Sequence, residues 1–234
     1  MKSKLTPLFI FIFFAFIAHA QYDSYYDGSM VGVGIGYNFL SVVGDDVRPV
    51  EVSFRYRINN DHSLQLFVPF LMQDDSFESK GHPEMELINT SLDSKKRLYG
   101  IGLDYDYALQ SFSQLDFVIG LRAEYQYYQY ETDLTNTYAS GNGLGAAEIT
   151  FRNKKSNNYI VSPNAGMRLN FYKFSVDAKF LLSMLSMNGD VDNHIEIREP
   201  ASSGKVSVTK EWTDEVSNKF KLKPAVLVSM AYFF

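Results

Sequence analysis

The sequence predicts an all-β fold: an eight-stranded antiparallel up-and-down transmembrane β-barrel with long outer loops and short periplasmic turns. Three observations predict it. Eight segments alternate apolar and polar residues, the second face of nearly every segment carries charges or glycines, and long connections alternate with short ones. After residue 20, no apolar run approaches the ~18–20 residues that a spanning helix needs, so strands are the remaining way to cross a bilayer.

The first 20 residues have the pattern of a secretory signal peptide. Lys2 and Lys4 form a basic start, residues 7–17 are apolar, and Ala18-His19-Ala20 is a small-residue cleavage site. We therefore expect three parts: a signal peptide at 1–20, a short periplasmic tail at 21–29 and one barrel domain at 30–234.

Composition narrows the possible partners. Without Lys2 and Lys4 the chain has 20 Lys and Arg against 27 Asp and Glu, a net charge of −7. This charge disfavours nucleic acid as a partner, because nucleic acid requires a basic surface. The chain has no cysteine, so the exported protein must be stabilised by its sheet and not by disulfides.

The first four strands are short alternating runs. In the first, Val31, Val33 and Ile35 alternate with glycines, and the next three strands repeat the alternation with charged or polar residues. A loop follows the first strand, and a tight turn rich in Asn and Asp follows the second. A long charged loop follows the third strand. These strands are expected at 30–40, 50–58, 63–70 and 99–107.

The last four strands follow the same rule. The two-residue turn Tyr172-Lys173 joins the sixth to the seventh. Beyond the seventh, residues 194–198 and 205–210 alternate around 200–204, which predicts an exposed hairpin. The strands are expected at 115–127, 159–171, 174–184 and 222–234.

Prolines and aromatic residues mark the ends of these strands. Pro69, Pro163 and Pro224 each remove a ladder donor, and we expect them toward the outer ends, at a bulge or rim. Aromatic residues on the apolar faces predict two girdles at the membrane interfaces. The periplasmic girdle comprises Tyr56, Tyr105, Tyr107, Phe117, Phe171, Phe174, Tyr232 and Phe234. The outer girdle comprises Tyr37, Phe39, Phe70, Tyr99, Tyr125, Tyr127 and Tyr159.

The polar faces predict a lumen filled with ion pairs. Eight strands enclose a space about wide enough for side chains, and buried charges must be paired. The turn at 172–173 sets a register in which Arg168 faces Asp177, and inward glycines such as Gly102 leave room for long arginine side chains. The inward charges are Glu51, Arg55, Arg57, Asp104, Asp106, Asp116, Arg122, Glu124, Arg168, Asp177, Lys179 and Lys223.

The sequence does not favour catalysis or a metal site. His62, His82 and His194 fall in turns or loops, and the adjacent His62 and Ser63 point to opposite faces of a strand. The acidic segment at 190–196 lacks the glycine and glutamate that a calcium loop needs. We expect no enzyme activity, no cofactor and no metal.

The chain ends on an aromatic residue, Phe234, with Tyr232 two residues earlier on the same face. From Met30 to this ending, Val228-Ser-Met-Ala-Tyr-Phe-Phe234, the chain resembles the small eight-stranded bacterial outer-membrane barrels: the OmpA membrane domain, OmpX and PorT-like proteins. The resemblance implies the outer membrane of a Gram-negative bacterium, with lipopolysaccharide around the barrel. It also implies that Tyr232 and Phe234 form the C-terminal signal that the barrel assembly machinery reads during insertion.

Three functions and one other fold remain open. The leading expectation is a plugged barrel with a structural or surface-interaction role, binding an extracellular ligand or protein through loops 72–96, 128–157 and 186–219. The alternative is a narrow pore for small solutes, gated near Asp104, Asp106 and Asp116, and a lipid-modifying enzyme is a weaker one. A soluble barrel of lipocalin type, with its apolar faces inward, would show the same alternation.

Overall fold

The computed structural model describes residues 31–39, 47–80, 87–112, 114–140, 143–198 and 206–234. The expected signal peptide and periplasmic tail lie outside these residues. The described chain forms eight antiparallel strands in a closed barrel, each paired with its neighbour in sequence and β1 paired with β8. The strands are β1 Val31–Asn38, β2 Val50–Arg57, β3 His62–Lys80, β4 Leu87–Phe112, β5 Leu115–Ser140, β6 Gly143–Phe171, β7 Phe174–Arg198 and β8 Val206–Phe233.

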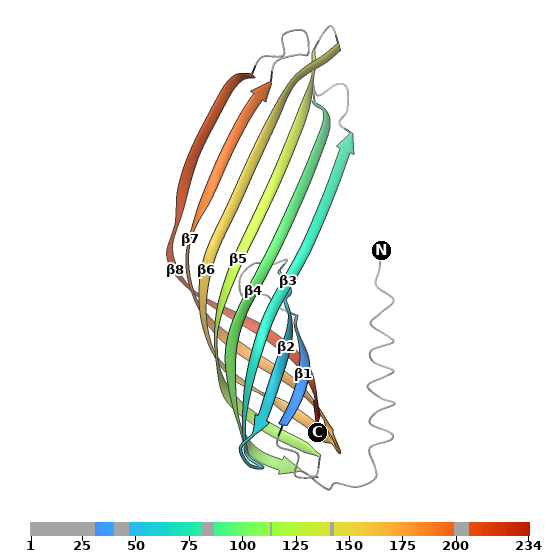
Figure 1. Cartoon of the computed structure of the whole chain (residues 1–234), viewed down its shortest axis with the longest axis vertical. Helices are drawn as coiled ribbons and strands as arrows, with labels where there is room; N and C mark the ends of the chain where they lie inside the picture. Colours follow the sequence, from blue (N-terminus) through green and yellow to red (C-terminus); the bar gives the residue numbers. More distant parts are fainter. Residues whose placement is uncertain (1–30, 40–46, 81–86, 113, 141–142, 199–205) are drawn as a thin grey trace.

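The short connections lie together at one end of the barrel, together with the end of β8 (Figure 1). The turn at 172–173 joins β6 to β7, and Tyr172 adopts a positive φ of 45° there. This turn pairs Phe171 with Phe174 and places Arg168 opposite Asp177, in the register expected from the sequence. The hairpin expected after β7 is also present, because Arg198 pairs with Val206.

Six of the strands continue far beyond the closed barrel. In Figure 1, β3–β8 rise as one curved sheet above the ends of β1 and β2. The closed part ends where Asn38 pairs with Leu227 and Val50 pairs with Phe70. We call the extension the upper sheet; it comprises residues 71–80, 87–98, 128–140, 143–156, 189–198 and 206–216.

The upper sheet is formed by segments that the sequence predicts as loops. Residues 72–96, 128–157 and 186–219 were expected as long loops, but their described parts are mostly paired strand. The strand signal in them is weak, because the outer face is mostly polar and the inner face mixes apolar residues such as Leu92, Leu134 and Ile195 with polar and charged ones. Residues 81–86, 141–142 and 199–205 lie outside the described residues.

In the closed part, side chains sort by face as the alternation predicts. Charged residues point inward and are buried, whereas large apolar residues point outward and are exposed, Val52 at 51% and Ile101 at 53%. This arrangement excludes the soluble barrel with inward apolar faces. Outward apolar residues come from every strand and include Val33, Ile35, Phe54, Leu66, Leu103, Ile119, Leu121, Val161, Met167, Phe180, Leu182 and Met230.

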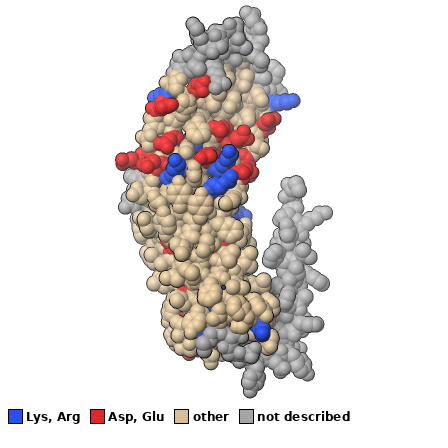
Figure 2. Space-filling view, in the orientation of Figure 1, with Lys and Arg blue, Asp and Glu red and all other residues tan. Residues whose placement is uncertain are grey.

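Aromatic side chains lie at both edges of this apolar belt. Near the short turns, the ring of His62 lies beside Tyr107, and Phe174 packs against Tyr232, with centroids 4.9 Å apart in each pair. At the other edge, the rings of Tyr99 and Tyr127 stack at 5.8 Å. Figure 2 shows charged side chains gathered on the upper sheet, above a broad zone with few charged atoms.

Pro69 and Pro163 do not lie at strand ends, contrary to expectation, whereas Pro224 lies on β8 just beyond its last pair with β1, at the rim of the closed part. Pro69 and Pro163 lie inside β3 and β6, and each interrupts one ladder without a change of register. Each strand keeps its other neighbour, since Pro69 pairs with Glu51 and Pro163 with Leu121. A missing donor is tolerated there because pairing resumes on both sides of the gap, so no bulge is needed.

No helix in the described part of the chain is long and apolar enough to cross a membrane.

Candidate functional site

The predicted inward charges lie inside the barrel, with one departure. All of them except Lys223 are at most 8% exposed. Lys223 is only partly buried, because it lies on β8 beyond the last β8 residue that pairs with β1. Charged groups buried this deeply are stable only with partners of opposite charge and satisfied hydrogen bonds.

The centre of the lumen is an ion-pair network built around Arg168 and Asp177. Arg168 Nε donates to Asp177 Oδ1 at 2.7 Å, and its Nη2 donates to Asp106 Oδ2 at 2.5 Å. Arg55, from the opposite wall, also donates to Asp177, and its Nη1 donates to Ser175 Oγ at 2.9 Å. One carboxylate therefore joins β2, β6 and β7 across the interior.

Lys179 completes this network from β7. Its Nζ lies 2.8 Å from Asp104 Oδ2 and 2.6 Å from Asp106 Oδ1. Asn164 donates to the other oxygen of Asp104 at 3.0 Å. Three acids and three bases thus meet here, and their charges balance.

A second network centres on Arg122, from β5. Its guanidinium donates to Glu51 Oε2 at 2.5 Å and lies 3.3 Å from Glu124 Oε2. Its carbon Cζ lies 3.5 Å from the centroid of the Phe67 ring, which is fully buried. Gln126 also donates to Glu124, at 3.0 Å. The guanidinium is therefore held by two carboxylates and one aromatic face.

The end of the lumen near the short turns is closed by a third group. Arg57 lies over the ring of Phe233 at 3.6 Å and donates to Asn170 Oδ1 at 3.1 Å. Asn170 in turn donates to Asp116 Oδ2 at 2.6 Å. The alternation in the sequence puts Phe67 and Phe233 on the inward face but does not reveal their contacts with arginines.

Two of the inward glycines, Gly102 and Gly32, make room for aromatic rings and not directly for arginines. A Cβ on Gly102 would lie 2.2 Å from Cζ of Phe67, and one on Gly32 would lie 2.9 Å from the ring of Phe233. These two rings then support Arg122 and Arg57. The expectation that glycines face the arginine side chains is corrected accordingly.

Above the charges, an apolar layer that sequence reasoning missed lines part of the lumen. Its core is the buried cluster Ile160, Leu181, Leu185, Met187, Ala225 and Leu227, with a second cluster at Val47, Leu98 and Tyr128. The signal was present, because Phe180-Leu181-Leu182 puts apolar residues on both faces of a strand. Buried apolar side chains therefore line part of the lumen above the charges, next to buried polar residues such as Ser162, Ser183 and Asn158.

Comparison with known structures finds small outer-membrane proteins. The chain is similar to the attachment invasion locus protein Ail of Yersinia pestis (13% identity, 88% of this chain and 99% of that chain, TM-score 0.35). It is also similar to a major outer membrane protein of Thermus thermophilus (12%, 88% and 100%, 0.43) and to CarO2 of Acinetobacter baumannii (11%, 88% and 99%, 0.40). No protein-family model and no curated sequence matches the chain.

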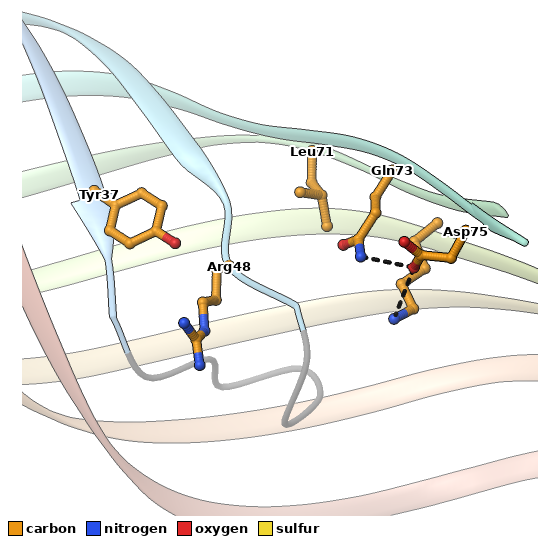
Figure 3. Close-up of a pocket in the computed structure, with 6 residues that line it drawn as sticks. Tyr37, Arg48, Leu71, Gln73 and Asp75 are labelled. Atoms are coloured by element: carbon orange, nitrogen blue, oxygen red, sulfur yellow. Dashed lines mark hydrogen bonds and ion pairs between the residues drawn. The ribbon is translucent and has the colours of Figure 1, made fainter. Parts of the chain in front are cut away.

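A cavity of about 490 Å³ opens where the β1–β2 hairpin ends beside β3. Tyr37 and Arg48 come from the hairpin, and Leu71, Gln73 and Asp75 come from β3 (Figure 3). Lys96, from β4, lies 3.9 Å from Asp75, which also accepts a hydrogen bond from Gln73. The cavity is polar and lies at the outer mouth of the barrel.

The outer face of the upper sheet is acidic. Its side chains alternate with those that continue the wall of the lumen, which we call the inner face. Arg97 pairs with Asp74 at 2.6 Å, and the hydrogen bond from Arg97 holds the pKa of Asp74 below its usual range. The acids of this face are Asp74, Glu78, Asp93, Glu131, Asp133, Asp190, Asp192, Glu196, Glu211 and Glu215.

The histidines do not assemble a catalytic group within the described residues. His62 lies on the outward face, with Nδ1 2.5 Å from the hydroxyl of Tyr105. Ser63 points into the lumen and accepts a hydrogen bond from Arg168 at 3.2 Å. His194 contacts Glu211, at 2.9 Å, and His82 lies outside the described residues. In the part of the chain that the structure describes, no three metal-binding side chains are grouped.

Proposed function

We propose that this chain is an integral outer-membrane β-barrel protein that acts without catalysis, as a structural or surface-interaction protein of a Gram-negative bacterium. In this proposal the lumen is plugged and the upper sheet, rather than flexible loops, presents the binding surface. Lipopolysaccharide and phospholipid surround the barrel, and Tyr232 and Phe234 form the signal for the assembly machinery. The alternative is a narrow pore for small solutes.

The observation that carries the proposal is the continuous outward belt of apolar side chains over a charged interior. Large apolar residues from every strand are exposed on this belt, which would be unstable against water. A bilayer removes the cost, and aromatic rings at both edges suit its two interfaces. The long polar strands of the upper sheet then extend beyond one interface.

Two layers support a plug over a pore. An ion would have to separate the buried pairs of Arg168 and Arg122, and then cross the apolar layer at Leu185. Breaking a buried pair costs several kcal/mol, and apolar side chains in a narrow lumen hinder the passage of ions independently. Either layer alone would hinder conduction.

The position of the belt can be tested with single cysteines, because the chain has none of its own. Val52→Cys lies on the belt and Asp192→Cys on the outer face of the upper sheet. In proteoliposomes, a water-soluble maleimide should label Asp192→Cys and spare Val52→Cys until detergent is added. Equal labelling of both before detergent would sink the membrane assignment.

Single-channel conductance distinguishes the plug from the pore. The mature protein, refolded into planar bilayers, should be silent. Arg168→Ala should also be silent, because the apolar layer at Leu185 remains. Insertion is confirmed in parallel by the labelling pattern above. Stable conductance in the wild type, enlarged by Arg168→Ala, would favour the pore.

A further inference from the structure

The inner face of the upper sheet carries an aromatic and amide row beside cations that the described residues leave unpaired. Arg152 on β6 is opposite Asn193 on β7, which is opposite Trp212 on β8. One row closer to the barrel, Lys154 occupies the same face of β6, because side chains two residues apart share a face. Trp212 is the only tryptophan in the chain.

Trp212 and Asn193 are held in place by one carboxylate. Asp214 Oδ2 accepts a hydrogen bond from the indole nitrogen of Trp212 and another from Asn193 Nδ2, each at 3.1 Å. Lys210 lies 5.2 Å from the centroid of the indole ring. The indole is therefore fixed, and only partly buried, on a face that is open above the barrel.

The cations nearby are not neutralised by the described part of the chain. The side chains of Arg152, Lys154 and Lys221 make no hydrogen bond or ion pair with any described residue. Burial of Lys154, together with the positive charges of Lys221 and Arg152, lowers the pKa of its ammonium group. The other inner-face acids are engaged elsewhere, Asp75 with Lys96 and Glu148 with the hydroxyl of Tyr138.

A polar group without a partner lies directly beneath these cations. Ser156 follows Lys154 on the same face of β6, is 1% exposed, and its hydroxyl has no hydrogen-bond partner among the described residues. Buried hydroxyls are normally paired. Mutually repelling cations above an unpaired donor make a site that an anionic group would stabilise.

We propose that this inner face binds an anionic saccharide: a sugar ring packs against Trp212, and its phosphate or sulfate group lies between Arg152 and Lys154. A planar, fixed indole suits the apolar face of a sugar ring, the amide oxygen of Asn193 can accept hydrogen bonds from its hydroxyls, and the two cations suit the anion. The proposal rests on the surface role proposed above and specifies the class of ligand. Such a sugar could come from lipopolysaccharide or from a sulfated glycan outside the cell.

Fluorescence of Trp212 tests the proposal directly, because no other tryptophan contributes. The mature protein in detergent micelles is titrated with glucose 6-phosphate, glucose or inorganic phosphate at constant ionic strength. Glucose 6-phosphate should change the emission saturably and bind about tenfold more tightly than either fragment, since each supplies only part of the contacts. This titration is carried out in micelles, whereas the conductance and labelling tests use bilayers. A negative titration would therefore contradict the saccharide site without contradicting the membrane barrel.

Matched variants separate this site from general charge attraction. Arg152→Gln and Lys154→Gln should each weaken binding about tenfold, a typical loss for one charge-assisted hydrogen bond. Lys155→Gln makes the same charge change on the opposite face of the same strand and should leave binding unchanged. Equal weakening by Lys155→Gln, no saturable response, or inorganic phosphate binding as tightly as glucose 6-phosphate would each overturn the proposal.

Competition then identifies the source of the sugar. Purified lipopolysaccharide displaces glucose 6-phosphate if the site recognises the surrounding leaflet, and chondroitin sulfate displaces it if the site recognises an external glycan. Either result supports an anionic-saccharide site. If neither lipopolysaccharide nor chondroitin sulfate displaces glucose 6-phosphate, even at high concentration, the proposal is contradicted.

Discussion

Arg168 and Asp177 face each other across the β6–β7 ladder inside the barrel, with Nε 2.7 Å from Oδ1 and both side chains at most 6% exposed. Arg168→Ala removes one hydrogen-bond donor from Asp106 and one from Asp177. We expect a loss of about 3–5 kcal/mol in the free energy of unfolding, because the carboxylates stay buried. Urea unfolding in detergent micelles measures it. Lys155→Ala, on the exposed outer face, is the control, and an equal loss in both would contradict the prediction.

The ring of Phe67 packs directly against Gly102 and leaves no space for a side chain at position 102. The Cβ of Gly102→Ala would lie 2.2 Å from Cζ of Phe67, so the ring must move away from Arg122. We expect a loss of about 1–3 kcal/mol in stability. A double-mutant cycle with Phe67→Leu checks the cause, because the smaller side chain should recover part of the loss. If the stability losses of Gly102→Ala and Phe67→Leu simply add in the double mutant, the contact between residue 102 and the Phe67 ring is not the cause.

Tyr172 occupies a backbone conformation that suits asparagine or glycine better. Its φ of 45° lies in the left-handed region, in the two-residue turn between β6 and β7. Tyr172→Asn should raise stability by about 0.5–1 kcal/mol, because asparagine tolerates this region more readily. Thermal unfolding measures the gain, and Tyr172→Phe should show none. An unchanged or lower melting temperature in Tyr172→Asn counts against strain at this turn.

The exposed pair Arg97–Asp74 gives a prediction in pH. The hydrogen bond from Arg97 lowers the pKa of Asp74, so the pair contributes above the usual aspartate pKa and is lost as pH falls through the lowered value. Arg97→Gln should move the titration of Asp74 upward, toward its usual range, as followed by carboxyl NMR shifts. Global stability should barely change, because the pair is solvent-exposed. A titration midpoint that stays fixed would show that Arg97 is not the cause.

Some of this architecture could be predicted from the sequence because its signals are local. The turn at 172–173 fixes the register that puts Arg168 opposite Asp177, and apolar alternation identifies the closed part of each strand. The upper sheet gives a weaker signal, because in 128–140 the outer face is polar while the inner face mixes Tyr128, Tyr130 and Leu134 with polar residues. The contacts of Arg122 with Phe67, and the apolar layer at Leu185, depend on which strands meet across the lumen, and pattern alone does not give that.

The shortness of β1 and β2 has a consequence for how the barrel comes together. All other ladders join consecutive strands, whereas β1 and β8 come from opposite ends of the described chain and share only the residues between Gly32 and Asn38 on β1. Hairpins with small sequence separation form readily, and a contact of this separation carries the largest loop-closure cost. We therefore expect the β1–β8 seam to form last and open first. The curled sheet of β3–β8 could then persist after the cylinder has come apart, so hydrogen exchange should be fastest along that seam.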